Sequence, residues 1–290
     1  MKKFGFTAIM IKIVFLTGML VIAVAILSPV LFTIITSFMK RDEVLHLYGM
    51  LYGNENEMRS FAGFHILPDR INFEQYINLF LFRPSYLEKY INSIILTFPI
   101  VSGQVVISCF AAYGFAKLVF PFRDKLFFLY IIVMLMPFQV TLIPNYIMMD
   151  QLGLMGSFES VILPGMFSTF GVFLLRQFMY LIPDEYIEAA KIDGAKVLQT
   201  FFRIVIPQCK SAIASLFILS FLDNWNMVEQ PMIMLTDEHM QPFSLLLAYI
   251  NDKDITLAFA GGVIYMVPAL CFALFSHTYL VRGIQMSGLK

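Results

Sequence analysis

The chain contains apolar runs that are too long to be ordinary core helices of a soluble protein. The first of them, from Ile13 to Phe38, has no charged residue over 26 positions. A helix needs about 20 apolar residues to cross the hydrocarbon core of a bilayer. The whole sequence agrees, since 59% of its 290 residues are hydrophobic and only 14% are charged. We therefore predict an all-α membrane protein with a single transmembrane domain.

Six runs are candidates for spanning helices, and four of them meet the length requirement directly. The fourth and fifth runs have only 16 and 12 uncharged residues. They become long enough if Arg176 extends toward the interface and Asp223 faces a polar interior. The six predicted spans are residues 13–38, 90–116, 126–149, 158–181, 209–228 and 255–281.

The basic residues indicate the direction of these spans. With the N-terminus inside, 13 of the 20 Lys and Arg residues fall on the inner side, as the positive-inside rule requires; this count includes the short loop 117–125 and the flanking residues Arg176 and Lys210. Lys40 and Arg41 directly follow the first span and oppose this orientation. The first run is longer than the apolar region of a signal peptide and no small-x-small cleavage site follows it, so we expect it to be retained. The predicted cytoplasmic segments are residues 1–12, 182–208 and 282–290, and the main external segments are residues 39–89 and 229–254.

The cytoplasmic segment 182–208 carries the clearest local signals. Pro183–Glu185, a proline followed by two acidic residues, is typical of a helix start. Asp193–Gly194 should end that helix, because glycine can adopt a positive φ and aspartate can cap the helix that follows. A second amphipathic helix is expected to run to Ile206, with an apolar stripe formed by Val197, Phe201 and Ile204. We call this pair of helices the knuckle; its spacing alone leaves open an ordinary loop lying on the membrane.

The knuckle resembles the EAA loop of bacterial ABC importer permeases. The pattern of that loop is E-A-A, three residues, Gly, nine residues, then I-x-L-P. The chain matches six of these seven positions, and Ile206 stands where the pattern has leucine. The matching residues are Glu188, Ala189, Ala190, Gly194, Ile204 and Pro207.

The resemblance extends over nearly the whole chain and is closest to the carbohydrate group, in particular the second membrane subunit of maltose-type transporters. It implies the type I ABC importer transmembrane domain, with six spans and cytoplasmic coupling helices, in the bacterial plasma membrane with both termini in the cytoplasm. Short matches follow one another in the family's order. They include Thr36–Phe38, Asn72–Tyr76, Asn92–Ser93, Ala112–Tyr113, Leu174–Phe178, Trp225–Asn226 and the tail Arg282–Lys290.

The family likeness also implies roles for the knuckle residues. In such permeases the EAA loop is a coupling helix that docks into a cleft of a separate ATP-binding subunit. Glu188 would make the polar contact with the ATPase, and Ala189–Ala190 would permit close approach. Asp193–Gly194 would form the turn. Ile204 and Pro207 would fix the second helix to the bundle.

The same resemblance implies the partners. These are a second membrane subunit that is a different chain, two ATP-binding subunits, and an extracytoplasmic sugar-binding protein. The sequence has no G-x-x-x-x-G-K-[ST] phosphate loop. We therefore expect no cofactor on this chain, with ATP and Mg²⁺ bound by the partner subunits. The net charge of zero gives no indication of nucleic-acid binding.

Polar residues near the outer end of the fifth span are candidates for the translocation path, because polar groups at membrane depth are costly without a purpose. Interfacial anchoring is the alternative. The single tryptophan of the group could equally be an interfacial belt residue or a platform for stacking a sugar. The four residues are Asp223, Asn224, Trp225 and Asn226.

The acidic external loop 229–254 has a polar tip that could contact the binding protein, as the corresponding loop can in maltose-type systems. A solvated loop without that role is the alternative. The residues of the tip are Thr236, Asp237, Glu238, His239 and Met240.

Two other functional classes fit the sequence less well. A secondary carrier for a small polar solute would need an ion or proton site within the membrane, and only Asp223 qualifies. A membrane-embedded enzyme would need a catalytic group, but the spans contain no paired carboxylates and no H-E-x-x-H. No Cys or His cluster has metal-ligand spacing.

Overall fold

The computed structural model describes residues 3–48, 67–249 and 255–287. All regular elements within these ranges are helical, which confirms the predicted all-α class. The described residues divide into two compact units. Among these residues, one unit consists of 3–48, 67–84 and 255–265, and the other of 85–249 and 266–287. Helix α15, Ile255–Ser287, contributes to both.

The first unit is dominated by the long helix α1. From Met10 to Pro29 every side chain of this helix is exposed, and most of them are apolar. A helix that is apolar on all faces needs lipid or another protein around it. Only the end of α1 packs within its own unit, where Ser37 Oγ lies 2.7 Å from Tyr76 Oη. The elements of this unit, apart from α15, are α1 Lys3–Thr36, α2 Arg41–Tyr48, α3 Glu74–Ile77 and the π-helical turn η3 Asn78–Phe82.

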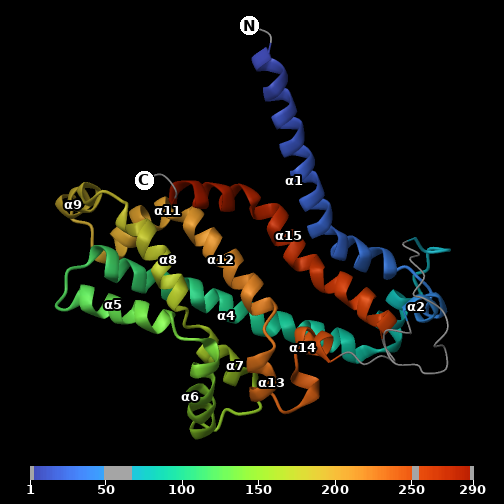
Figure 1. The fold of residues 1–290 in the computed structure, drawn as a ribbon. Helices are drawn as coiled ribbons and strands as arrows, with labels where there is room; N and C mark the ends of the chain where they lie inside the picture. The colour runs from blue at the N-terminus through green and yellow to red at the C-terminus, as the bar shows by residue number, and fades with distance from the viewer. Residues whose placement is uncertain (1–2, 49–66, 250–254, 288–290) are drawn as a thin grey trace. The chain divides into compact units, whose positions relative to one another are not determined.

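The second unit is a helical bundle in which α4, α8 and α12 pack together (Figure 1). Small residues allow these helices to approach closely. A Cβ atom at Gly171 of α8 would lie 2.4 Å from Ser108 Oγ of α4, so a larger residue does not fit there. Outside the knuckle, the helices of this unit include α4 Pro84–Lys117, α5 Arg123–Met134, α6 Phe138–Gln151, α7 Phe158–Gly165, α8 Thr169–Tyr180, α12 Lys210–Trp225, α13 Glu229–Met234 and α14 Phe243–Ala248.

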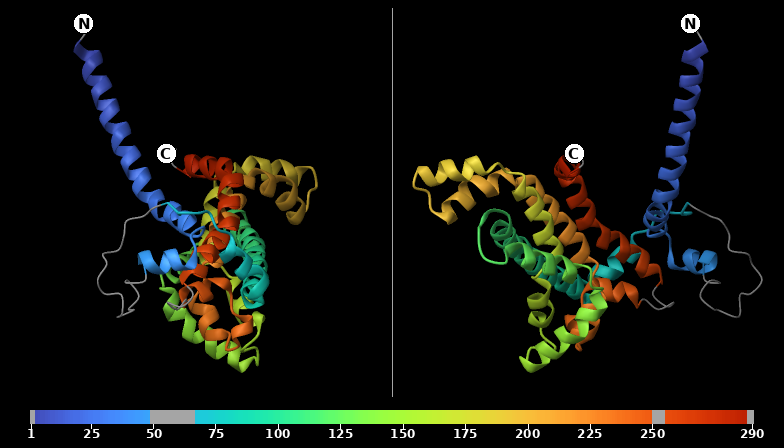
Figure 2. Two further views of the ribbon diagram at one scale, coloured as in Figure 1. Left: turned by 90° about the vertical axis from the view of Figure 1, so that its right-hand side faces the viewer. Right: turned by 60° about the vertical axis from the view of Figure 1, so that its left-hand side comes forward.

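The helices of the second unit place two loops at its opposite ends. Figures 1 and 2 show the knuckle at one end, and α13 and α14 toward the other. One buried cluster lies beside the knuckle and contains residues of α4, α8 and α12. A second cluster, nearer α13, joins Leu96 and Ile100 of α4 to Leu142 and Met149 of α6.

Three helical segments in the described part of the chain are long and apolar enough to cross a membrane: residues 10–36, 84–117 and 158–180. Two bent pairs raise this number to five if each pair is one span. The pair α5–α6 covers the predicted third span and bends by 100° at Pro137, which is the N-cap of α6. The helix of the predicted fifth span, α12, follows the knuckle at a bend of 77°. The described apolar part of α15 is shorter, so six spans and their boundaries remain predictions.

Candidate functional site

The knuckle begins with α9, which runs from Asp184 to Ile192. Pro183 precedes it in an extended conformation, with a ψ of 139°. Asp184 and Glu185 occupy the first turn, where the helix dipole favours negative charge. The helix start therefore lies where the sequence predicted it.

The end of α9 is a glycine cap. Gly194 has a φ of +78°, which a residue with a Cβ atom adopts only with strain. The amide of Ala195 donates to the carbonyl of Ala190 at 2.9 Å, and the amide of Gly194 donates to that of Lys191 at 3.0 Å. These two bonds form a Schellman motif, which satisfies carbonyls that the helix end would leave free. The motif fixes the angle at which the chain leaves α9.

The second helix of the knuckle is irregular. The backbone amide of Lys196 donates to Gln199 Oε1 at 2.8 Å and thereby starts the helix. Its middle is a π-helical turn, and it continues through Pro207 instead of ending at Ile206 as predicted. Proline has no amide hydrogen, and π-helical turns provide a way to pass such an interruption in the hydrogen-bond ladder. The three pieces are α10 Val197–Thr200, η4 Phe201–Val205 and α11 Ile206–Gln208.

The π-helical turn changes which residues face the bundle. Phe201, Val205 and Cys209 are buried at four-residue steps, in the cluster beside α4 and α8. Val197 is exposed and Ile204 is only partly buried, so the predicted stripe is correct at Phe201 alone. A regular α-helix was assumed in that prediction, whereas a π-helical turn holds an additional residue.

The knuckle exposes a carboxylate and several apolar side chains. Glu188 and Ala189 are exposed, whereas Ile187 and Ala190 face inward and are buried. Ala190 therefore packs within the chain in this structure. Ile192 is 86% exposed. Exposed apolar side chains of this kind, where they lie outside a membrane, are typical of surfaces that bind another protein. The exposed apolar side chains, which the sequence interpretation missed, are Tyr186, Ile192, Leu198 and Phe202.

Lys117, the last residue of α4, holds the start of the knuckle. Its Nζ donates to the carbonyl of Ile182 at 2.5 Å and to Asp184 Oδ1 at 2.6 Å. The basic side chain sits at the C-terminus of α4, where the helix dipole favours a cation. The signal in the sequence was only a lysine that ends an apolar run.

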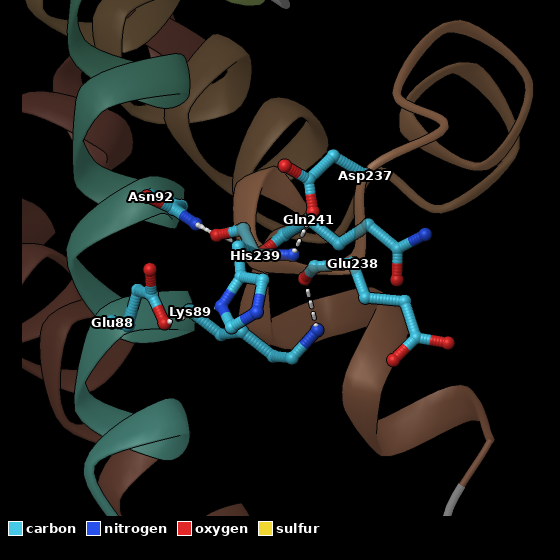
Figure 3. A network of polar contacts seen from close by, with 7 residues as sticks. All are labelled: Glu88, Lys89, Asn92, Asp237, Glu238, His239 and Gln241. Carbon is cyan, nitrogen blue, oxygen red and sulfur yellow. Dashed lines mark hydrogen bonds and ion pairs between the residues drawn. The ribbon is translucent and has the colours of Figure 1, made fainter. Parts of the chain in front are cut away.

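The tip that was predicted to be external is bound to the other end of α4 (Figure 3). Three residues of α4, at positions i, i+3 and i+4, satisfy backbone groups of segment 238–243. We call this arrangement the latch. Its hydrogen bonds are Lys89 Nζ to the Glu238 carbonyl (2.5 Å), Asn92 Nδ2 to the carbonyls of His239 (2.6 Å) and Gln241 (3.2 Å), and the Phe243 amide to Ser93 Oγ (2.8 Å).

The predicted tip residues lie together around the short 3-10 helix Glu238–Met240. Thr236 and Asp237 precede it and are exposed. Asp237 caps it by accepting from the amide of His239 at 2.9 Å. His239 Nδ1 lies 3.2 Å from Glu88 Oε2, and this hydrogen bond raises the pKa of His239 above its ordinary 6.5. The tip is thus an ordered and mostly exposed surface.

The four candidate path residues do not share one environment. Asp223 and Asn226 are exposed on α12. Trp225 is 2% exposed and stacks on Phe221, with ring centroids 5.4 Å apart, while Tyr90 meets it edge-on at 5.7 Å. Its ring faces are covered by the protein, so in this conformation Trp225 is not a platform for a sugar.

Asn224 belongs to a polar network between three helical segments. Its Nδ2 donates to the Ser220 carbonyl at 2.7 Å and lies 3.4 Å from Gln104 Oε1 of α4. Gln104 Nε2 in turn donates to the carbonyl of Gly165 at 2.7 Å. Gly165 ends α7 at the break before α8, so Gln104 satisfies a carbonyl that the break leaves free. The amide side chains of this network stabilise the broken helix.

Arg176 of α8 does not simply extend toward the interface. Its guanidinium carbon lies 3.8 Å from the ring centroid of Phe127 in α5 and 5.7 Å from that of Tyr180. Its Nε is buried and has no hydrogen-bond partner within the described residues. Cation–π contact is thus the main interaction shown for this side chain.

Comparison with known proteins gives a consistent family. Residues 104–286 match the family model of the binding-protein-dependent transport system inner membrane component. The arabinooligosaccharides transport system permease protein AraQ of Bacillus subtilis (strain 168) is 30% identical over 249 residues, which cover 84% of this chain and 88% of that protein. The sn-glycerol-3-phosphate transport system permease protein UgpE of Pectobacterium atrosepticum is 29% identical, covering 67% of this chain and 71% of that protein.

A solved structure shares the fold. It is a chain of a bacterial ABC transporter involved in the import of the acidic polysaccharide alginate. The TM-score is 0.79 at 21% identity, and the match covers 94% of this chain and 97% of that chain.

Proposed function

The chain belongs to the family of binding-protein-dependent transport system inner membrane components, and from this premise we propose that it forms half of the translocation path of an ABC importer for a sugar or oligosaccharide. It is a transport subunit and not an enzyme. In this proposal, energy reaches it from a separate ATPase through the knuckle.

The observation that carries the coupling role is the knuckle itself. Glu188 and four apolar side chains are exposed on it, and Gly194 fixes its turn. Exposed apolar and aromatic side chains favour a protein partner, and an exposed carboxylate among them can accept hydrogen bonds from that partner. In a bundle whose spans are in lipid, such a patch outside the membrane has a protein as its natural partner.

The proposed substrate class rests on the relatives and on the chemistry of the path. The similar proteins transport arabinooligosaccharides and sn-glycerol-3-phosphate, and the structural match imports alginate. All of these substrates carry several hydroxyl groups. In this chain Asp223 is exposed near the outer end of α12 and offers a carboxylate that can bind hydroxyl groups. Asn226, which follows α12, is also exposed, and its Nδ2 donates to the Leu222 carbonyl at 2.7 Å.

The proposed assembly follows from the same premise. A second, different membrane subunit completes the path, and two ATP-binding subunits with ATP and Mg²⁺ bind at the knuckles. An extracytoplasmic sugar-binding protein contacts the tip, Thr236–Met240. Both termini lie in the cytoplasm of a bacterium, and the chain crosses the plasma membrane several times.

The test uses the complex purified after co-expression with its ATP-binding subunits and reconstituted in lipid. Glu188→Ala should lower the amount of co-purified ATPase, or its transport-coupled activity, by roughly tenfold, as for a central interface residue. Glu185→Ala is the matched control, because Glu185 is an exposed acid of the same helix outside the EAA pattern. If both variants retain as much co-purified ATPase and coupled activity as wild type, Glu188 has no role in coupling. Substrates are then compared by uptake of labelled oligosaccharides and polyol phosphates.

A further inference from the structure

Helix α4 makes polar contacts at both of its ends with the two loops that the proposed function assigns to docking. At one end the latch residues hold the tip, and at the other Lys117 holds the start of α9. We propose that α4 is a strut that transmits movement of the knuckle to the external tip. The inference rests on the proposed function for the identity of the two docking partners.

The contacts at the latch suit a positioning role because they are made to the backbone of the tip. Asn92 Nδ2 reaches two carbonyls, of His239 and Gln241, and Ser93 Oγ accepts from the Phe243 amide. The side chains of Glu238 and His239 remain exposed for another molecule. The path of the loop is thus set by α4, whereas its outer surface is set by the loop's own side chains (Figure 3).

At the inner end, a side chain of α4 likewise binds the backbone of the loop. Lys117 binds the carbonyl of Ile182 and the carboxylate of Asp184, which are on either side of Pro183. These residues lead directly into α9. A shift of α9 must therefore either move the end of α4 or break both bonds of a buried lysine.

The helix between the two contacts is continuous and supported along its length. From Asn92 to Lys117 it spans roughly 38 Å at the rise of an α-helix. Buried residues occur on it at three- and four-residue steps, from Asn92 through Ile100 and Ser108 to Ala116. Pro99 lies within the helix without ending it. Gly103 allows Met166 to pack directly against the backbone, since a Cβ atom there would lie 2.4 Å from Met166 Cγ. Close packing of this kind transmits strain, which favours movement of α4 as a body.

The experiment measures hydrogen–deuterium exchange in the whole complex, with its ATP-binding subunits, before and after trapping with ATP, Mg²⁺ and vanadate. In wild type, trapping should change exchange at α9 and also at residues 237–243, the latter by roughly fivefold, a typical size for coupling between sites. Lys117→Met and Asn92→Leu should each abolish the response of the tip. The double variant should behave as the single ones, because both cut one connection.

A control variant and the exchange data themselves separate coupling from misfolding. Ile91→Ala changes an exposed neighbour of Asn92 and should keep the response of the tip. Unchanged exchange in α8 and α12 shows that a variant is folded. If the tip responds in Lys117→Met as in wild type, or does not respond in wild type while α9 does, α4 is not the strut. If α9 itself shows no response to trapping, the coupling function of the knuckle fails and the strut with it.

Discussion

Lys117 and Asp184 form an ion pair at 2.6 Å in which the base is buried and the acid is exposed. The side chain of Lys117 is only 3% exposed, whereas that of Asp184 is 77% exposed. The two partners are therefore not equivalent. If the Asp184 carboxylate is removed, water can accept the hydrogen bond from Lys117 in its place. If Lys117 is removed, the Ile182 carbonyl also loses its side-chain donor.

This asymmetry predicts unequal effects of two neutralising substitutions. Lys117→Met removes both hydrogen bonds and should lower the stability of the complex by about 1–3 kcal/mol, as expected for bonds to a charged donor. Asp184→Asn keeps an acceptor oxygen, and exposed ion pairs contribute little, so its effect should stay below about 1 kcal/mol. Thermal unfolding of the purified complex measures both. Equal losses in the two variants would show that the ion pair itself, and not the buried lysine, stabilises the site.

The positive φ of Gly194 predicts that alanine is unfavourable there for reasons of backbone conformation. No atom lies within 4 Å of the Cβ position, so the cost of Gly194→Ala is strain, about 1–2 kcal/mol. The strain would be relieved by turning the chain at the end of α9, and coupling to the ATPase should weaken. Gly114→Ala is the matched control, since that glycine is helical and has equally open space around it. It should be neutral or slightly stabilising. Coupled ATPase activity and thermal unfolding are measured for both variants. A loss in Gly194→Ala but not in Gly114→Ala supports backbone strain at Gly194, and no loss in Gly194→Ala contradicts it.

The covered ring of Trp225 predicts a structural role. Trp225→Phe keeps an aromatic ring against Phe221 and Tyr90 but leaves a space, because phenylalanine is smaller. We expect a lower melting temperature of the complex with an unchanged KM for the transported sugar. Asn226→Ala, on the exposed side of the same helix, should instead raise KM if that face lines the path. A large increase in KM for Trp225→Phe with no loss of stability would restore the stacking role.

The pair of His239 and Glu88 predicts a pH dependence of the tip. Hydrogen bonding to Glu88, assisted by the charge of Asp237 and opposed by that of Lys89, raises the pKa of His239 above 6.5. Because the pKa is raised, the stabilisation of the tip by the His239–Glu88 pair is fully present below pH 6.5 and is lost as the pH rises through the folded-state pKa. Because His239 is exposed, the effect is small.

Exchange of the amides of segment 238–243, corrected for the intrinsic rate, measures this dependence. In wild type it should increase as the pH rises from 6 to 8, values chosen to bracket about 6.5, the ordinary pKa of histidine. Glu88→Gln should show weaker dependence over the same interval. An identical pH profile in both would rule out the pair as the cause.

Much of the knuckle could be predicted because its signals are local. Pro183 and the acidic pair after it start a helix, and Gly194 ends one, whatever the rest of the chain does. The all-α class was equally accessible, since long uncharged runs leave the backbone few other ways to satisfy its hydrogen bonds in lipid. The residues on the inward face of the second helix could not be predicted, because the π-helical turn changes the periodicity on which the prediction depended.

The contacts of α4 could not be predicted, because they join residues far apart in the sequence. Asn92 and Gln241 are 149 positions apart, and Lys117 and Asp184 are 67 apart. In the sequence, Asn92–Ser93 is only a short family-like match, and Lys117 is only the residue that follows the predicted span 90–116. The burial of Trp225 could not be predicted for the same reason, because Tyr90, which contacts it, is on another helix and far away in the sequence.

The π-helical turn before Pro207 also bears on which lengths of chain this segment can tolerate. An α-helix turns by about 100° per residue. Removing one residue between Gly194 and Pro207 could restore regular α-helical geometry, yet it would rotate the preceding residues by that angle relative to α12. Phe201 would then leave the bundle, and an exposed residue would take its place. The number of residues between Gly194 and Ile204, which is nine, therefore sets which side chains of the second helix face the bundle. A deletion there should be more damaging than most substitutions at the same positions.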